Sequence, residues 1–279
     1  MSELSGRTFL VTGANTGIGK ETARNLAGRG ARVVIAGRSE EKTRAAMKEI
    51  ADDTGNTDLD YVPLDLGDLA SVRAAAATFL AAGEPLHVLI NNAGLAGKRG
   101  VTTSGFELAF GTNHVGTFLL TELLRDHIVA SGTGRIVNVA STGHYRAPGI
   151  DWDAVRQYSA TRTAFGEYCV SKLANVLHAR ELGRRLEGTG VTTYSLHPGA
   201  IASDVWREVP PGLRQVMKLF MKNTEQGART TLYCATSPDV AGTTGRYYDN
   251  QREKQPSKVV TDELAAELWE RSEAWVAAP

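Results

Sequence analysis

The chain has 279 residues, of which 42% are hydrophobic and 22% charged, so it can bury a large core as one α/β domain or two small ones. Lysine plus arginine and aspartate plus glutamate both number 31, and this zero net charge argues against nucleic acid or another polyanion as partner. No apolar run approaches the roughly 20 residues that a membrane helix needs, so no integral membrane segment is expected.

Short β-branched runs alternate with longer stretches rich in Ala, Leu and Arg, which is typical of parallel strands joined by helical crossovers. All but the first and last of these strands are mostly apolar on both faces, as a sheet covered by helices on each side requires. No linker or internal repeat divides the alternation, so we expect one α/β domain over residues 1–279, a doubly wound seven-stranded parallel sheet with helices on both faces. The seven predicted strands are Thr8–Thr12, Arg32–Ala36, Leu59–Pro63, Val88–Asn91, Arg135–Ala140, Val191–Leu196 and Gly245–Tyr248.

A glycine-rich turn follows the first strand. Gly13, Gly17 and Gly19 lie in Thr12-Gly13-Ala14-Asn15-Thr16-Gly17-Ile18-Gly19-Lys20, before a helical pattern from about Glu21 to Gly28. Glycines let the backbone turn tightly and approach a pyrophosphate, which then sits at the helix N-terminus. An ordinary glycine-rich connection would look similar, but the position at the first crossover favours a dinucleotide site.

The second strand is followed by Arg38, where a site that prefers NAD usually carries an acid that holds both ribose hydroxyls. The guanidinium of Arg38 suits a 2′-phosphate, and Lys42, about one turn into the next helix, adds a second positive charge. The alternative is a solvated Arg and Lys beside Glu40 and Glu41. We favour NADP(H), and no metal site is expected.

Tyr168 and Lys172 lie four residues apart in a stretch that predicts a helix as far as Leu186. Positions i and i+4 share a helix face, so the ammonium can approach the phenol. A free phenol has a pKa near 10, and a nearby positive charge favours the phenolate and lowers that pKa. Because this spacing arises by chance in many helices, its meaning depends on the neighbouring motifs.

Two further polar residues have suggestive positions. Ser141 ends the fifth strand, where its hydroxyl can hydrogen-bond a substrate oxygen, and Asn113 falls in the preceding helical region. Taken separately, each residue is usually structural. Asn113, Ser141, Tyr168 and Lys172 together resemble, in order and context, the catalytic tetrad of the short-chain dehydrogenase/reductase family. The resemblance spans the chain from about Ser5 to Asp249.

The resemblance implies a single-domain Rossmann fold and an oxidoreductase that moves a hydride between NADP(H) and a carbonyl or alcohol. Tyr168 would exchange the proton, Ser141 would steady the substrate oxygen, and Lys172 would lower the phenol pKa and hold the nicotinamide ribose. The side-chain amide of Asn113 would hold a water linked to Lys172.

The resemblance also assigns cofactor contacts. Asp65 would meet the adenine amino group, although an aspartate there could equally cap a helix. Asn91-Asn92-Ala93-Gly94 would border the adenine-side ribose and brace the sheet, with Thr12 packing at the glycine turn. Pro198-Gly199 and Ser203 would lie beside the nicotinamide carboxamide. The predicted cofactor-binding residues are Gly13, Asn15, Thr16, Gly17, Ile18, Gly19, Arg38, Lys42, Asp65, Leu66, Asn92, Ala93, Gly94, Tyr168, Lys172, Pro198, Gly199 and Ser203.

Within the family, the segments Gly111–Phe118, Tyr168–Asn175 and Leu196–Gly199 look most like the retinol-dehydrogenase-like branch. Two differences argue against a retinoid: the sequence shows no N-terminal membrane anchor, and Ala140 stands where that branch often carries serine. We expect instead an apolar aldehyde, ketone or alcohol. The irregular stretches Thr142–Phe165 and Ala200–Glu225 both follow strands and should frame the substrate pocket, because ligands bind beyond strand carboxyl ends.

Several alternatives stay open at this stage. Apolar residues within 200–225 fit a substrate lid and packing against the body equally well, with peripheral membrane contact as a third option. A non-catalytic NADPH-binding redox-sensing module would keep the glycine turn, and a nucleotide-sugar dehydratase or epimerase would need a C-terminal substrate domain that the chain lacks.

The cellular setting is also an expectation. Cys169 and Cys234 are too few for a disulfide framework and suit a reducing compartment as buried thiols, so we expect a cytoplasmic protein. The resemblance implies a homodimer or homotetramer built on the helices near Asn113 and Tyr168.

Overall fold

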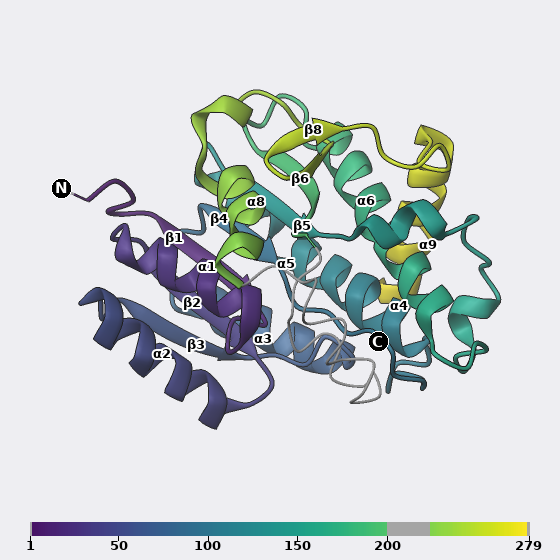
Figure 1. Cartoon of the computed structure of the whole chain (residues 1–279), viewed down its shortest axis with the longest axis horizontal. Coiled ribbons are helices and arrows are strands. Elements are labelled where there is room, and N and C mark those ends of the chain that lie inside the picture. The colour runs from purple at the N-terminus through teal and green to yellow at the C-terminus, as the bar shows by residue number, and fades with distance from the viewer. Residues whose placement is uncertain (1, 200–223, 278–279) are drawn as a thin grey trace.

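The computed structural model describes residues 2–199 and 224–277, and eight strands in these ranges form one sheet (Figure 1). The strand order is β3-β2-β1-β4-β5-β6-β7-β8, and all neighbours are parallel except β7 and β8. All seven predicted strands are confirmed, with boundaries within one residue. The strands are β1 (Thr8–Thr12), β2 (Arg32–Gly37), β3 (Leu59–Pro63), β4 (Val88–Asn91), β5 (Arg135–Val139), β6 (Thr192–His197), β7 (Arg246–Asp249) and β8 (Arg252–Lys254).

The two edges of the sheet differ from the prediction. The eighth strand, β8, turns back antiparallel to β7 through Asn250 and Gln251, which both have positive φ. Its three residues are charged and exposed, so no hydrophobic alternation predicts it, and such a short charged strand protects a sheet edge from pairing. At the opposite edge, β3 is not apolar on both faces, because Asp60 and Pro63 are exposed there.

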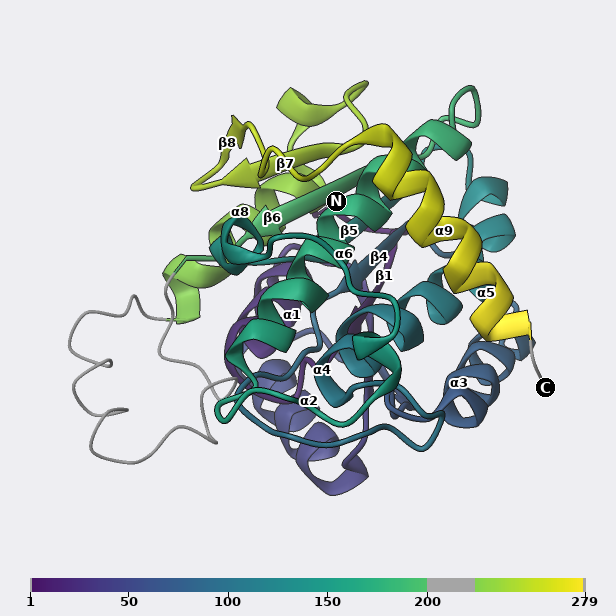
Figure 2. The same ribbon diagram turned by 90° about the vertical axis from the view of Figure 1, so that its right-hand side faces the viewer.

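Helices cover both faces of the sheet (Figures 1 and 2). One face carries α1 (Gly17–Gly28), α2 (Glu40–Thr54) and α8 (Thr224–Thr236), and the other carries α3 (Leu69–Ala81), α5 (Gly116–Ala130) and α6 (Phe165–Arg185). The C-terminal helix α9 (Asp262–Ala277) packs against α6. The short helical turns are α4 (Leu108–Phe110), the π-helical η1 (Gly111–Val115), and the 3-10 turns η2 (Thr142–Arg146), η3 (Ala154–Arg156) and η5 (Pro238–Val240). None of the helices in the described ranges is both long and apolar enough to cross a membrane.

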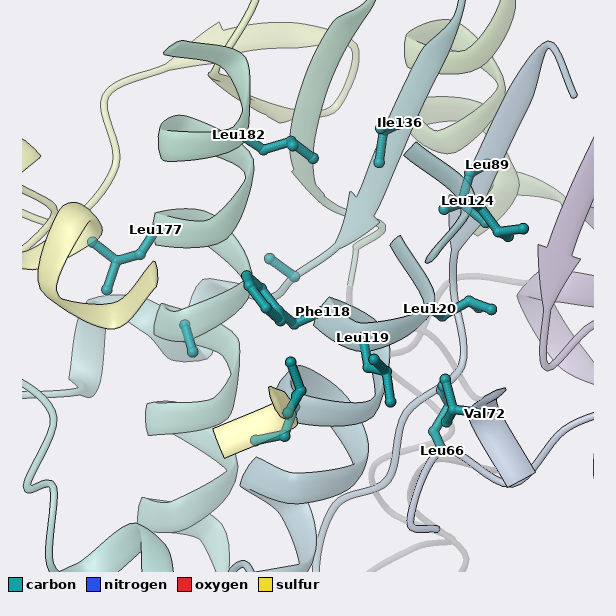
Figure 3. Close-up of a cluster of buried hydrophobic side chains, with 14 of the residues drawn as sticks. Leu66, Val72, Leu89, Phe118, Leu119, Leu120, Leu124, Ile136, Leu177 and Leu182 are labelled. Atoms are coloured by element: carbon teal, nitrogen blue, oxygen red, sulfur yellow. The ribbon is translucent and has the colours of Figure 1, made fainter. Parts of the chain in front are cut away.

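The core lies on both sides of the sheet because successive side chains of a strand point to opposite faces. All five residues of β1 are buried: Phe9 and Val11 pack toward α1 and α8, and Leu10 packs with the residues of α3, α5 and α6. Figure 3 shows the second of these clusters, where Leu89 and Ile136 of the sheet meet leucines of α5 and α6. Burying a side chain of this size contributes roughly 1.5–3 kcal/mol each.

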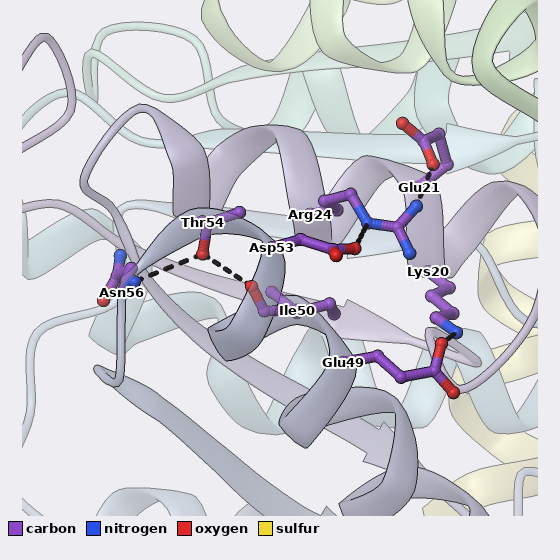
Figure 4. Close-up of polar contacts among 8 residues, drawn as sticks. All are labelled: Lys20, Glu21, Arg24, Glu49, Ile50, Asp53, Thr54 and Asn56. Carbon is purple, nitrogen blue, oxygen red and sulfur yellow. Dashed lines mark hydrogen bonds and ion pairs between the residues drawn. The ribbon is translucent and has the colours of Figure 1, made fainter.

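Polar contacts tie α1 to α2 and the connection that follows it (Figure 4). Lys20 pairs with Glu49, and Arg24 Nε lies 2.9 Å from a carboxylate oxygen of Asp53. Exposed pairs of this kind contribute little stability. Asn56 Nδ2 donates to the carbonyls of Ala27 and Ala31, at 2.9 Å each. These contacts hold α2, which begins just after Arg38, against the helix that starts at the glycine turn.

The helices on which the resemblance implies a subunit interface, α5 and α6, are partly covered by α9 of the same chain. The buried Trp269 lies 4.9 Å from the ring of Phe118 on α5, and the guanidinium of Arg185 on α6 lies 4.5 Å from the Trp269 ring. Ser272 Oγ is 2.9 Å from His114 Nε2. This part of the two helices is therefore not available for association, and the interface that the resemblance implied stays a prediction for their remaining surface.

Gly116, the first residue of α5, packs closely against the backbone of Leu66. A Cβ on Gly116 would lie 2.1 Å from the backbone oxygen of Leu66, which cannot move independently of its chain. We expect Gly116→Ala to lower the free energy of unfolding by about 1–3 kcal/mol in urea titrations, because of overpacking. Gly28→Ala is the matched control, since a Cβ there meets only Thr54 Cγ2 at 3.6 Å. Equal stability of the two variants would contradict the packing described.

Candidate active site

A pocket of about 690 Å³ lies at the carboxyl ends of the parallel strands. It brings together the glycine turn after β1, Arg38 after β2, the ends of β4 and β5, and Pro198-Gly199 after β6. The described site residues predicted from the sequence all line it except Asn113, which is buried behind it. Ser203, and positions 200–223 of the segment predicted as a lid, lie outside the described residues.

The glycine turn presents a helix N-terminus to this pocket. Gly13 and Gly17 have φ of +67° and +58°, and α1 begins at Gly17, four residues earlier than predicted. The side chain of Thr16 does not cap the first amides, and no acidic residue lies in the first turn. A Cβ on Gly19 would lie 2.6 Å from the carbonyl oxygen of Gly13, so only glycine permits this approach. Uncapped amides at the positive end of a helix are suited to an anion such as a pyrophosphate.

Thr12 braces the sheet where the strand order reverses, between β1 and β4. Its buried Oγ1 accepts from the amides of Asn92 and Ala93, at 3.0 and 2.9 Å. Asn92 Nδ2 donates in return to the Thr12 carbonyl at 2.8 Å. On the next strand pair, Asn91 Nδ2 donates to Asn138 Oδ1 at 2.8 Å. The structure thus shows the bracing expected of Asn91–Gly94 and the packing expected of Thr12.

Arg38 and Lys42 lie exposed at one end of the pocket. Neither side chain forms an ion pair with any residue in the part of the chain that the structure describes. Glu40, whose proximity supported the alternative of a merely solvated pair, is instead paired with Arg44 at 2.7 Å. Within the described ranges, no carboxylate competes with a ligand for these two cations.

Asp65 lines the same end of the pocket. Its Oδ1 accepts from the amide of Gly67 at 2.9 Å. The alternative role of Asp65 as a helix cap is wrong, because Asp68 is the N-cap of α3 and its Oδ1 accepts from the amide of Ala70 at 3.0 Å. The adenine role of Asp65 stays a prediction.

Tyr168 and Ser141 meet at the other end of the pocket. The phenol of Tyr168 is hydrogen-bonded to the Ser141 side chain, whose Oγ also accepts from the amide of Gly143 at 3.0 Å. Burial raises the pKa of Tyr168 to about 12, and the Ser141 hydrogen bond opposes that shift. The phenol is therefore neutral at physiological pH and carries a proton that it can donate.

Lys172 is buried one helical turn from Tyr168. Its Nζ donates to the Val139 carbonyl at 2.7 Å and lies 5.9 Å from the centroid of the Tyr168 ring. Burial lowers the pKa of Lys172 to about 8. Burial dominates the pKa of Tyr168 in the protein alone, and the role of Lys172 in lowering that pKa stays a prediction.

Asn113 lies in the π-helical turn η1 and is fully buried. Its Oδ1 accepts from the amide of Leu95 at 2.9 Å, and its Nδ2 donates to the Leu95 carbonyl and to Ser171 Oγ. Ser171 Oγ in turn donates to the carbonyl of Tyr168 at 2.7 Å. Both amide hydrogens are used, so a water held by this side chain would have to donate to Oδ1, and that role stays a prediction. It joins the loop after β4 to α6 beneath Tyr168.

His144 holds the backbone of Ser141, a contact that sequence reasoning missed. Its Nδ1 is 2.6 Å from the Ser141 carbonyl and must donate to it, while Nε2 accepts from the amide of Ser257 at 3.1 Å. These two bonds require a neutral ring, and burial lowers the pKa of His144 accordingly. A histidine three residues beyond a strand-end serine is the signal that the sequence offered.

Several further lining residues were not predicted as site residues, and three of them carry functional groups or rings near Tyr168 or Ser141: Arg146, Phe165 and His197. Phe165 lies nearly parallel to Tyr168, with ring centroids 6.2 Å apart and 28° between planes. The amide of Thr142 donates to His197 Nδ1 at 3.3 Å. Two of these three residues come from the stretch Thr142–Phe165, which was expected to frame the substrate pocket.

Comparisons with known proteins agree with this geometry. The profile of the short chain dehydrogenase family matches residues 7–213. Human retinol dehydrogenase 12 is 44% identical over 273 residues, which cover 96% of this chain and 85% of that protein. Human dehydrogenase/reductase SDR family member 13 is 43% identical over 279 residues, or 98% of this chain and 74% of that protein.

Solved structures show the same fold. The crystal structure of an uncharacterized protein from Mycobacterium paratuberculosis has a TM-score of 0.77 at 33% identity, covering 98% of this chain and 94% of that one. A variant of actinorhodin polyketide ketoreductase solved with NADPH has a TM-score of 0.67 at 28% identity, covering 88% and 97%. The fold, the family profile and relatives above 40% identity along nearly the whole chain confirm the resemblance: the chain belongs to the short-chain dehydrogenase/reductase family of oxidoreductases, in its retinol-dehydrogenase-like branch.

Proposed function

We propose that the protein is an NADP(H)-dependent oxidoreductase that transfers a hydride between the nicotinamide and an aldehyde, ketone or alcohol with an apolar body. One observation carries this proposal. A single pocket joins two features at one end to the hydrogen-bonded Tyr168 and Ser141 at the other: the uncapped amides of α1, and the cations of Arg38 and Lys42, which form no ion pair with a described residue. A dinucleotide is long enough to span such a pocket.

The residues of the pocket fit this cofactor. The uncapped amides at the start of α1 suit its pyrophosphate, and Arg38 with Lys42 suits a 2′-phosphate. Gly94 lets the chain pass close to the catalytic end, because a Cβ there would lie 3.3 Å from Lys172 Nζ and 3.2 Å from Asn113 Oδ1. Lys172 would hold the nicotinamide ribose, and Pro198-Gly199 would lie against the carboxamide side.

The chemistry follows from the residues at the catalytic end. The bound nicotinamide supplies or accepts the hydride. In reduction, Tyr168 donates its proton to the substrate oxygen as negative charge develops there, and Ser141 donates a hydrogen bond to the same oxygen. Asn113, through Ser171, and His144, through the Ser141 carbonyl, keep the two hydroxyls in position. Oxidation of an alcohol follows the reverse path.

The cellular setting is part of the proposal. The two cysteines are free and buried, which suits a reducing compartment, and we place the protein in the cytoplasm. A homodimer or homotetramer would use a surface other than the face of α5 and α6 that α9 covers.

Removal of the Tyr168 hydroxyl tests the catalytic role. We expect Tyr168→Phe to lower kcat at least about 100-fold across a panel of aromatic and alkyl aldehydes, because the proton donor is lost. NADPH binding, followed by fluorescence titration, should stay within a few-fold. Tyr158→Phe, which changes an exposed tyrosine outside the pocket, is the control. A wild type that binds NADPH but turns over no carbonyl or alcohol would favour the non-catalytic redox-sensing module instead.

Neutralising Arg38 tests cofactor choice. We expect Arg38→Leu to reduce kcat/KM for NADPH about 10- to 100-fold, as loss of a charge-assisted hydrogen bond implies, and to change the value for NADH little. Arg44→Leu, which removes a paired arginine from α2, should leave the ratio unchanged. A wild type that clearly prefers NADH would contradict the role given to Arg38.

Burial of the Lys172 ammonium should make the free energy of unfolding depend on pH. The folded pKa of Lys172, about 8, lies below its unfolded value of 10.5, so between these values the unfolded chain binds more protons and stability rises with pH. We expect wild type to gain on the order of 1 kcal/mol relative to Lys172→Met between pH 7 and pH 9 in urea titrations. Parallel pH profiles for the two proteins would show that Lys172 does not titrate there.

A further inference from the structure

A column of stacked side chains leads from the catalytic phenol to the rim of the pocket. Phe165 is stacked nearly parallel on Tyr168, and the guanidinium carbon of Arg146 lies 5.7 Å from the centroid of the Phe165 ring. All three residues line the pocket, and Arg146 is exposed. A substrate whose reacting carbon meets Tyr168 can therefore lie along Phe165 and reach the guanidinium.

The described residues that line the pocket near Tyr168 include positively charged side chains but no carboxylate. Among the described residues that line the pocket, the only carboxylate is Asp65, which follows β3 at the far end. Lys172 is buried and bound to the Val139 carbonyl. The side chain of Arg146 has no hydrogen bond or ion pair with any residue in the ranges 2–199 and 224–277.

An exposed arginine is ordinarily a solvated surface group, and three features set Arg146 apart. Its stacking on Phe165 orients the guanidinium, which reduces the entropy lost when it binds a ligand. It lies on the wall of the catalytic pocket, and no described carboxylate competes for it there. Its charge also acts on α6, because it opposes the rise that burial causes in the pKa of Cys169, the neighbour of Tyr168.

We propose that Arg146 binds a carboxylate of the substrate, so that the natural substrates are carbonyl compounds or alcohols with an apolar body and a carboxylate at the end remote from the reacting carbon. This inference rests on the proposed function, because Tyr168 defines the reacting end. The planar fork of one guanidinium matches a carboxylate, which it can bind through two parallel hydrogen bonds. Phe165 is half-buried and lines the pocket between the two ends, so the part of its ring that faces the pocket offers an apolar surface to the body of the substrate.

The reaction of such a substrate balances without the carboxylate taking part. In reduction of an aldehyde, the carbonyl carbon gains the hydride lost by NADPH, and the oxygen gains the proton of Tyr168. The phenolate regains a proton from water. The products are the primary alcohol and NADP⁺, and the Arg146–carboxylate pair changes only how tightly the substrate is held.

The test compares acids with their esters. Values of kcat/KM are measured with NADPH for 4-formylbenzoate, for the longer 4-formylcinnamate and for the methyl ester of each. We expect wild type to prefer the acid over its ester in at least one pair. Arg146→Gln should lower kcat/KM for that acid about 10- to 100-fold and leave the ester within about threefold. Arg146→Lys keeps the positive charge but not the planar guanidinium, so its kcat/KM for the acid should lie between those of wild type and Arg146→Gln.

Two controls separate the outcomes. Arg162→Gln removes another exposed arginine that does not line the pocket, and it should leave the preference for the acid unchanged. Added KCl should weaken the preference in wild type, because salt screens the pair.

The carboxylate assignment would be overturned if Arg146→Gln lowered kcat/KM equally for acid and ester, or if wild type did not prefer the acid. Reduction of the esters would still support the proposed function in either case. If the chain reduces neither acids nor esters nor any other carbonyl, the proposed function fails and this inference fails with it.

Discussion

The hydrogen bond from Lys172 Nζ to the carbonyl of Val139 is the contact on which the catalytic end of the pocket depends. A buried ammonium is costly unless it is hydrogen-bonded, and this bond places α6 against the carboxyl end of β5. Ser141 follows β5 by two residues and Tyr168 precedes Lys172 by one helical turn, so the same contact brings the two hydroxyls together. The cost of burying the ammonium appears as its pKa of about 8.

The cofactor end depends on a different constraint, the reversal of strand order between β1 and β4. The loops after these strands diverge there, and Thr12 holds them together through two amides and a carbonyl. The glycine turn and the uncapped start of α1 lie directly above this brace. The carboxyl ends of the parallel strands thus carry both the uncapped amides of α1 and the hydroxyls of Tyr168 and Ser141, as the proposed dinucleotide site requires.

Two polar side chains behind the pocket, those of Asn113 and His144, hold the backbone near Tyr168 and Ser141 in place. Asn113 donates its two amide hydrogens to the Leu95 carbonyl and to Ser171 Oγ. His144 links the Ser141 carbonyl to the amide of Ser257. Through His144, the segment between β8 and α9 supports the backbone of Ser141. The same C-terminal region covers α5 and α6 through Trp269. The end of the chain therefore shapes both the site and the surface available for association.

The sequence by itself determined seven of the eight described strands and the glycine turn, because periodicity and short motifs are local properties. The resemblance to a family assigned most of the predicted residues that meet in the pocket. It did not reveal β8, whose three charged residues carry no hydrophobic pattern. Only the tertiary structure decided that burial raises the pKa of Tyr168, that the amide of Asn113 is already bonded, and that Arg146 stacks over Phe165. Burial, partner choice and stacking depend on which distant segments pack together, and no local pattern encodes that.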